Sequence, residues 1–81
     1  MFRPEITPEV MTQRGAGRLP GLAGVEIIRI AADGVTGRLP VRPELLAPNG
    51  YLHAASVIAL ADTLAGYGTF ANLPQGAKSF T

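Results

Sequence analysis

The sequence predicts a small α+β domain in which an antiparallel hairpin precedes one long helix. Residues 25–41 favour the hairpin, because β-branched residues dominate the first half and Asp33-Gly34 is typical of a tight turn. Residues 52–72 favour the helix, because they are rich in alanine and leucine and Pro74 ends the run. At 81 residues the chain holds one domain at most.

The segments around these two elements carry weaker signals. Residues 1–24 are expected to form a short helix that ends near Arg14, because a threonine cap and a first-turn proline start it, and then a loop rich in glycine and proline. Residues 42–50 are expected to connect the hairpin to the long helix. This connector has room for one helical turn at 43–46 and ends in a tight change of direction.

The predicted long helix is too apolar to pack on a hairpin alone. It carries an apolar stripe at helical spacing, made of Val57, Leu60, Ala61 and Leu64. Three or more strands are normally needed to cover such a helix. Residues 79–81 favour the start of a third strand. We therefore expect the chain to be the amino-terminal part of a domain that is truncated after the helix.

Composition argues against several classes of function. The chain is 47% hydrophobic and 16% charged, which is too apolar for a disordered segment and leaves surface for another chain. A net charge of +1 and the lack of a basic cluster give no basis for binding nucleic acid. With one histidine and no cysteine, the chain is expected to hold no metal and no cofactor.

The expected location is the cytoplasm. The first ten residues contain no apolar run of signal-peptide length. The most apolar stretch, residues 57–73, carries Asp62 near its middle. A charge at the centre of a bilayer costs about 2.5–3.5 kcal/mol. We therefore expect no membrane span and no membrane partner.

Asp62 is the strongest candidate for chemistry. A carboxylate inside a mostly apolar helix is costly unless it is exposed, paired or used in a site. Its helix neighbours three and four residues away include no counter-charge. Two interpretations stay open: Asp62 faces solvent on an amphipathic helix, or it acts in a functional site.

His53, the only histidine, lies at the predicted start of the helix. A lone histidine is more often structural than catalytic, and here it can cap backbone groups or pack. His53 and Asp62 are nine residues apart, so they point to opposite sides of one helix, about 13 Å apart along its axis. If both act on one substrate, a second copy of the chain must supply one of them.

The backbone at the helix start is a further candidate. N–H groups in a first helical turn have no partner within the helix, and the helix dipole adds positive potential there. Such a donor can polarise a carbonyl oxygen on which negative charge develops. Every helix has such an end, so the position alone names no reaction.

The run GYLHAASVIALADTLAGYG, residues 50–68, resembles the PaaI-type branch of the hotdog-fold thioesterases, in the 4-hydroxybenzoyl-CoA thioesterase-like superfamily. The residues that match in order and spacing are Gly50, Leu52, His53, Leu60, Ala61, Asp62 and Thr63. With the hairpin before it and the Phe-Thr pair after it, the resemblance covers roughly residues 20–81.

The resemblance implies a hotdog fold, in which an antiparallel sheet wraps a long central helix, and hydrolysis of an acyl-CoA to a carboxylic acid and CoA. It implies that Asp62 is the nucleophile or the general base that activates water. The Ala54 N–H would polarise the thioester carbonyl, and His53 would help to place it. Thr81 would assist the water or the aspartate. In such dimers the aspartate comes from the opposite subunit, so a homodimer or tetramer is expected.

Three positions depart from the family pattern. Ala54 and Ala55 replace two glycines, which keeps the Ala54 N–H but narrows the approach of a substrate. Ala47 occupies the family's asparagine position, and Asn49 is the nearby residue that can take its place. Asn49 and Gly50 are the residues expected to contact substrate. The lost glycines and the expected truncation favour an alternative: a catalytically inactive hotdog segment that serves only packing or dimerisation.

Overall fold

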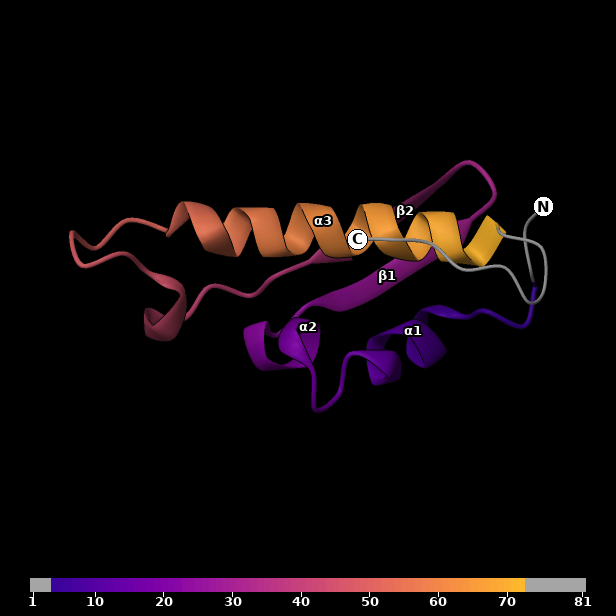
Figure 1. The fold of residues 1–81 in the computed structure, drawn as a ribbon, viewed down its shortest axis with the longest axis horizontal. Coiled ribbons are helices and arrows are strands. Elements are labelled where there is room, and N and C mark those ends of the chain that lie inside the picture. The colour runs from indigo at the N-terminus through magenta and orange to yellow at the C-terminus, as the bar shows by residue number, and fades with distance from the viewer. Residues whose placement is uncertain (1–3, 73–81) are drawn as a thin grey trace.

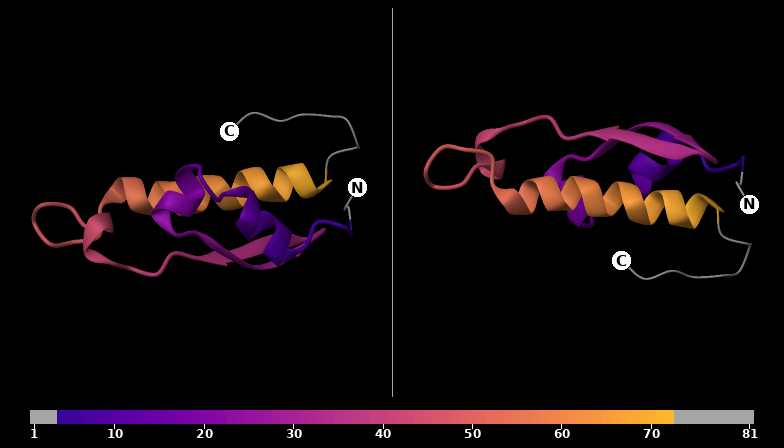
Figure 2. Two further views of the ribbon diagram at one scale, coloured as in Figure 1. Left: turned by 90° about the horizontal axis from the view of Figure 1, so that it is seen from below. Right: turned by 90° about the horizontal axis from the view of Figure 1, so that it is seen from above.

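The computed structural model describes residues 4–72 of the chain. A two-stranded antiparallel sheet, β1 (Glu26–Ala31) and β2 (Gly34–Arg38), packs against a 19-residue helix, α3 (Ala54–Asn72) (Figure 1). Views from below and above show α3 running along one face of the hairpin (Figure 2). The predicted α+β class is confirmed for this part of the chain. The predicted third strand, at 79–81, lies outside the described residues.

Two short helices precede the sheet. α1 (Pro8–Arg14) begins where the sequence predicts it, because Thr7 Oγ1 accepts a hydrogen bond of 3.2 Å from an N–H of the first turn. α2 (Leu19–Ala23) lies where a loop is predicted, so that prediction is wrong. Pro20 stands in its first turn, and Gly24, at φ 96°, ends it in the left-handed conformation. Proline and glycine therefore mark the two ends of a helix here.

A β-bulge decides which side chains of β1 reach the core. The pairing slips between Ile27 and Arg29, so one residue of β1 is extra. In a regular strand, residues three apart face opposite sides, but Ile27 and Ile30 are both buried while Ile28 is half exposed. The two strands are also shorter than the predicted hairpin of residues 25–41.

The hydrophobic core lies between the hairpin, α1, α2 and the inner side of α3. Its buried members are Ile6, Met11, Ala23, Val25, Ile27, Ile30 and Ala71. Glycines let the helix come close to the sheet. A Cβ at Gly37 would lie 2.5 Å from Leu64 Cδ2, and one at Gly68 would lie 3.1 Å from Val35 Cγ2. The close approach predicted for this helix therefore depends on a glycine from each partner.

The side of α3 that meets the core differs from the predicted stripe. Leu60 and Leu64 pack against the core, but Val57 is 50% exposed and Ala61 is exposed as well. The inner side continues instead through Tyr67. Half of the predicted stripe is therefore wrong. The reason is that α3 is apolar on nearly all sides, so periodicity does not single out one face.

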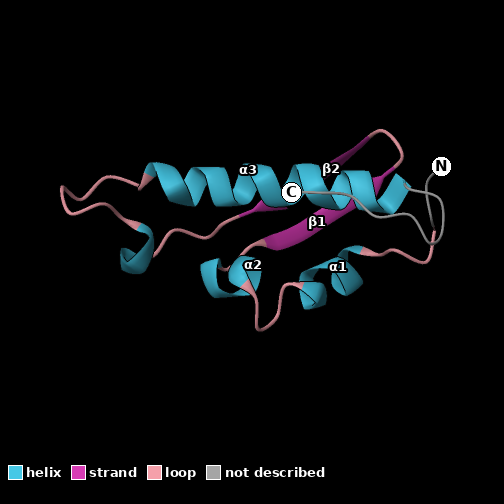
Figure 3. Ribbon diagram, viewed as in Figure 1, coloured by secondary structure: helices cyan, strands magenta, loops and turns pink. Residues whose placement is uncertain are grey.

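The connector between β2 and α3 is tied to both neighbouring helices. It contains one 3-10 turn, η1 (Pro43–Leu45), where a helical turn is predicted (Figure 3). Arg42 donates through both terminal guanidinium nitrogens, at 2.6 Å each, to the last carbonyls of α2. Ser56 Oγ, in the first turn of α3, donates to the Leu45 carbonyl at 2.9 Å. These bonds hold α2 beside the start of α3.

Candidate active site

His53 is the residue from which α3 begins. Its carbonyl accepts a helical hydrogen bond from the Ser56 N–H at 2.9 Å, and its imidazole Nδ1 accepts another from the Ala55 N–H at 2.9 Å. His53 is therefore the N-cap of the helix, and the capping interpretation is confirmed. Because Nδ1 is an acceptor in this bond, the proton of the neutral ring lies on Nε2.

The Ala54 amide is the first N–H of α3. Within residues 4–72 it donates to no other group, whereas the next amide, that of Ala55, is bonded to His53. Ala54 is exposed and lies in the positive field of the helix N-terminus. The start of α3 thus presents an unpaired backbone donor on an exposed residue.

The loop before His53 is shaped by Asn49 and Gly50. The side-chain oxygen of Asn49 accepts a 3.1 Å hydrogen bond from the Tyr51 N–H, and the Ala47 N–H donates to the Tyr51 carbonyl at 2.7 Å. Gly50 has a φ of 90°, a conformation that side-chain-bearing residues adopt only with strain. Both residues therefore build the turn that leads the chain to the start of α3.

Asp62 faces solvent on the outer side of α3, the side formed by Val57, Ile58, Ala61 and Ala65. Among the residues described, Asp62 forms no ion pair and no hydrogen bond through its side chain. Val57 and Ile58 are 50% and 64% exposed. A lone carboxylate amid exposed apolar side chains is typical of a surface that meets another molecule.

One chain does not bring His53 and Asp62 together. Helix geometry puts them about 13 Å apart along the axis of α3 and half a turn apart around it. His53 and the Ala54 amide form one local arrangement, and Asp62 lies apart from it. Thr81, the remaining predicted catalytic residue, lies outside the described residues.

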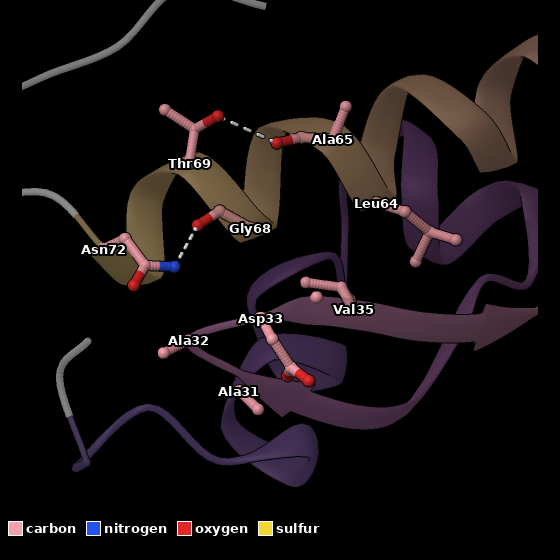
Figure 4. Close-up of a pocket in the computed structure, with 10 residues that line it drawn as sticks. Ala31, Ala32, Asp33, Val35, Leu64, Ala65, Gly68, Thr69 and Asn72 are labelled. Atoms are coloured by element: carbon pink, nitrogen blue, oxygen red, sulfur yellow. Dashed lines mark hydrogen bonds between the residues drawn. The ribbon is translucent and has the colours of Figure 1, made fainter. Parts of the chain in front are cut away.

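A cavity of about 440 Å³ lies between the hairpin turn and the last turns of α3 (Figure 4). The polar side chains that line this cavity already form hydrogen bonds. Thr69 and Asn72 donate to carbonyls of their own helix at 3.0 and 2.9 Å. Arg29 donates to Asp33 at 2.8 Å, and this hydrogen bond and the positive charge hold the pKa of Asp33 below its ordinary value. None of the predicted site residues lines this cavity.

A second cavity, of about 430 Å³, lies between α2, the connector and the first two turns of α3. Leu19 and Leu22 line it from α2, and Ala55 and Ala59 line it from α3. Ala55 joins this cavity to the helix start, since its N–H is the one bonded to His53. None of these residues is among the predicted site residues, because a loop is predicted where α2 lies. Two leucines three residues apart, with Pro20 directly after the first and Gly24 two residues after the second, were the available signal.

α3 is long and apolar enough to cross a membrane, by length and composition alone: it has 19 residues and a mean hydropathy of 1.2. Two observations count against that use. Leu60 and Leu64 pack against the core formed with the hairpin. Asp62 lies near the middle of the helix, where a bilayer would have to accommodate its charge.

Comparison with known proteins places the chain in no family: no family model matches it, and no curated protein matches its sequence. In the part of the chain that the structure describes, no three His, Asp or Glu side chains lie close enough together to hold a metal ion. The candidate active site therefore consists of the His53 cap, the Ala54 amide and, at a distance, Asp62.

Proposed function

We propose that this protein is an acyl-CoA thioesterase of the PaaI-type hotdog class, which hydrolyses a thioester to a carboxylic acid and CoA. The observation that carries the proposal is the start of α3, where His53 caps the Ala55 amide and the Ala54 N–H has no partner among the described residues. The motif of residues 50–68, with Asp62 at its expected place, supports the same function. A hairpin packed along one long helix is compatible with the hotdog arrangement.

The Ala54 N–H supplies electrophilic assistance. The thioester carbonyl oxygen accepts a hydrogen bond from it, and this bond strengthens as negative charge develops on the oxygen. His53 acts on the reaction through the cap, because its bond to the Ala55 amide holds the first turn in one orientation. Asn49 and Gly50 shape the loop beside this turn and form the edge over which substrate approaches.

Asp62 supplies the second half of the chemistry. As a carboxylate it takes a proton from the water that attacks the thioester carbon, or it attacks that carbon itself to form an anhydride that water then hydrolyses. In both routes the carbon–sulfur bond breaks, the acyl group leaves as a carboxylic acid and CoA leaves as its thiol. Neither route uses a metal or a cofactor.

The complete site needs two copies of the chain. His53 and Asp62 of one helix face opposite ways, so the Asp62 that acts beside one Ala54 belongs to another copy. The outer side of α3, with Val57 and Ile58 exposed around Asp62, gives that copy an apolar surface to bury. A homodimer is the smallest assembly that completes the site, and a tetramer repeats it.

We place this enzyme in the cytoplasm. Asp62 near the middle of α3 makes a membrane span costly. The inner side of the helix, through Leu60 and Leu64, is already packed on the core. Both observations favour a helix that packs within a protein assembly over one that lies among lipid chains.

A second candidate function is a segment that only packs or dimerises. The observation that favours it is the outer side of α3, where Val57 and Ile58 are exposed beside a single charge. Ala54 and Ala55, at the positions of the two family glycines, also narrow the approach of a substrate to the helix start.

Thioester hydrolysis separates the two functions. The purified chain is incubated with a panel of acyl-CoAs, and the released CoA thiol is measured. We expect turnover that falls by about 100-fold or more in Asp62→Asn, which keeps the shape of the side chain but removes the base. Glu9→Gln, at an exposed carboxylate on α1, is the matched control and keeps full activity. A dimeric protein without turnover on any acyl-CoA would leave only the packing function.

A further inference from the structure

The cavity between α2 and α3 is defined by apolar walls. Leu19 and Leu22 form one side, and Ala55 and Ala59, one turn apart on α3, form another. Its volume of about 430 Å³ lies in the range of small-molecule sites. Small side chains at the two α3 positions leave this space open, and larger ones would fill it.

The polar side chains that line this cavity, those of Arg42, Glu44 and Ser56, are already paired, and Glu44 forms an ion pair of 3.5 Å with Arg42 Nε. Ser56 Oγ is buried and donates to the Leu45 carbonyl at 2.9 Å. The Arg42 guanidinium donates to the carbonyls of Leu22 and Ala23 at 2.6 Å each. A ligand inside the cavity therefore meets mostly hydrocarbon. Since an unpaired polar group would lose its hydrogen bonds to water there, the ligand has to be apolar where it fills the space.

The cavity adjoins the helix start. Ala55 lines it, and the Ala55 N–H is bonded to His53 Nδ1. The unpaired Ala54 amide belongs to the residue immediately before Ala55. A chain-like ligand that fills the cavity can therefore bring a polar end to the Ala54 N–H.

We propose that this cavity holds the hydrocarbon part of the substrate, an unbranched acyl chain of medium length. The inference rests on the proposed thioesterase function and names the acyl class that the reaction accepts. The chain buries the side chains of Leu19 and Leu22, which are 65% and 74% exposed without it. Arg42 holds α2 in place as the outer wall, through its bonds to the end of that helix.

An acyl chain fits this space better than a second copy of the protein does. A flexible hydrocarbon can lie in a partly open groove lined on two sides by small and aliphatic residues. Its carbonyl end also matches the unpaired donor at Ala54. A second copy would more readily cover the open outer side of α3 around Asp62.

Binding is tested by NMR on the whole isotope-labelled chain, with S-octyl-CoA, a thioether that cannot be hydrolysed, and with octanoate. We expect both probes to shift the signals of Leu22, Ala55 and Ala59. Ala59→Phe fills the cavity and is expected to weaken binding of S-octyl-CoA by at least about tenfold. Ala32→Phe adds the same ring at an exposed position of the hairpin turn, away from this cavity, and as the control it keeps the affinity.

Leu22→Asp is a second variant that leaves the protein interior alone, because the Leu22 side chain is 74% exposed. A charge in the cavity wall is expected to weaken S-octyl-CoA by about tenfold or more and to leave the affinity for free CoA unchanged. Equal losses in Ala59→Phe and Ala32→Phe would overturn the proposal. So would shifts confined to the outer side of α3.

Failure of this inference is distinguishable from failure of the proposed function. If S-octyl-CoA binds in the cavity but octanoyl-CoA is not hydrolysed, the proposed thioesterase function is wrong and the apolar binding site is supported. If acyl-CoAs are hydrolysed at rates that do not depend on acyl-chain length, and Ala59→Phe leaves these rates unchanged, the acyl site is wrong and the thioesterase function is supported.

Discussion

The imidazole of His53 and the backbone of Ala55 are joined by a 2.9 Å hydrogen bond. This bond caps α3, and it also occupies the amide next to that of Ala54. Within residues 4–72 the Ala54 N–H is then left as an unpaired donor whose direction is fixed by the capped turn. His53 is therefore a positioning residue. It orients the first turn of α3, and the Ala54 N–H of that turn would bind the substrate carbonyl.

Replacing the cap is expected to cost stability. His53→Ala removes the acceptor of the Ala55 N–H and should lower the free energy of unfolding by about 1 kcal/mol. His53→Asn restores a side-chain acceptor that is common at N-caps, and it should keep most of the wild-type stability. Urea denaturation of the three proteins measures the effect. Equal stability of the alanine and asparagine variants would contradict the capping role.

Any side chain added at Gly37 is expected to destabilise the contact between β2 and α3. In Gly37→Ala the new Cβ would lie 2.5 Å from Leu64 Cδ2 and 3.0 Å from the Glu26 carbonyl oxygen, so the end of the Leu64 side chain must move and the packing against β1 must adjust. We expect a loss of about 1–3 kcal/mol in the free energy of unfolding. Gly34→Ala is the control, because a Cβ there meets nothing within 4 Å. Similar losses in the two variants would show that the close approach is not the cause.

The ion pair at the hairpin turn is expected to appear in an NMR titration. The hydrogen bond and charge of Arg29 hold the pKa of Asp33 below 3.8. Because the folded pKa is the lower one, the pair stabilises the fold above about pH 3.8, and this contribution is lost as the pH falls through the folded pKa. In Arg29→Gln the Asp33 pKa should return toward 3.8. An unchanged pKa would mean that Arg29 does not cause the shift.

Much of the fold was predictable because turn and cap residues have backbone preferences that depend only on a few neighbouring residues. Asp33-Gly34 predicts the hairpin to within one residue. The turn is formed by Ala32 and Asp33, and Gly34 already pairs with Ala31 as the first residue of β2. α2 was missed for the opposite reason. Pro20 and Gly24 favour either a loop or the two ends of a helix, and the choice is made at a distance, by the bonds from Arg42 to the end of α2.

The candidate site was predictable only in part. His53, Asp62 and their separation follow from one helix, whose period is known in advance. Which side of α3 is buried does not follow, because the helix is apolar nearly all around and the hairpin selects Leu60 and Leu64. The cavity beside Ala55 could not be predicted from the sequence either, since it exists only where α2 packs against α3.

The central claim is that Ala54 of one copy and Asp62 of another copy form one thioesterase site. Two variants remove these groups separately. Ala54→Pro deletes the N–H and keeps the helix, because proline is favoured at the first position of a helix. Asp62→Asn deletes the carboxylate. Each variant alone is expected to lose about 100-fold or more in turnover.

The most direct measurement is the activity of an equal mixture of these two variants after subunit exchange. Half of the dimers are then mixed, and each mixed dimer holds one site with both groups intact, so we predict recovery of about a quarter of wild-type turnover. A mixture that has exchanged subunits and stays as inactive as its two components would contradict the shared site.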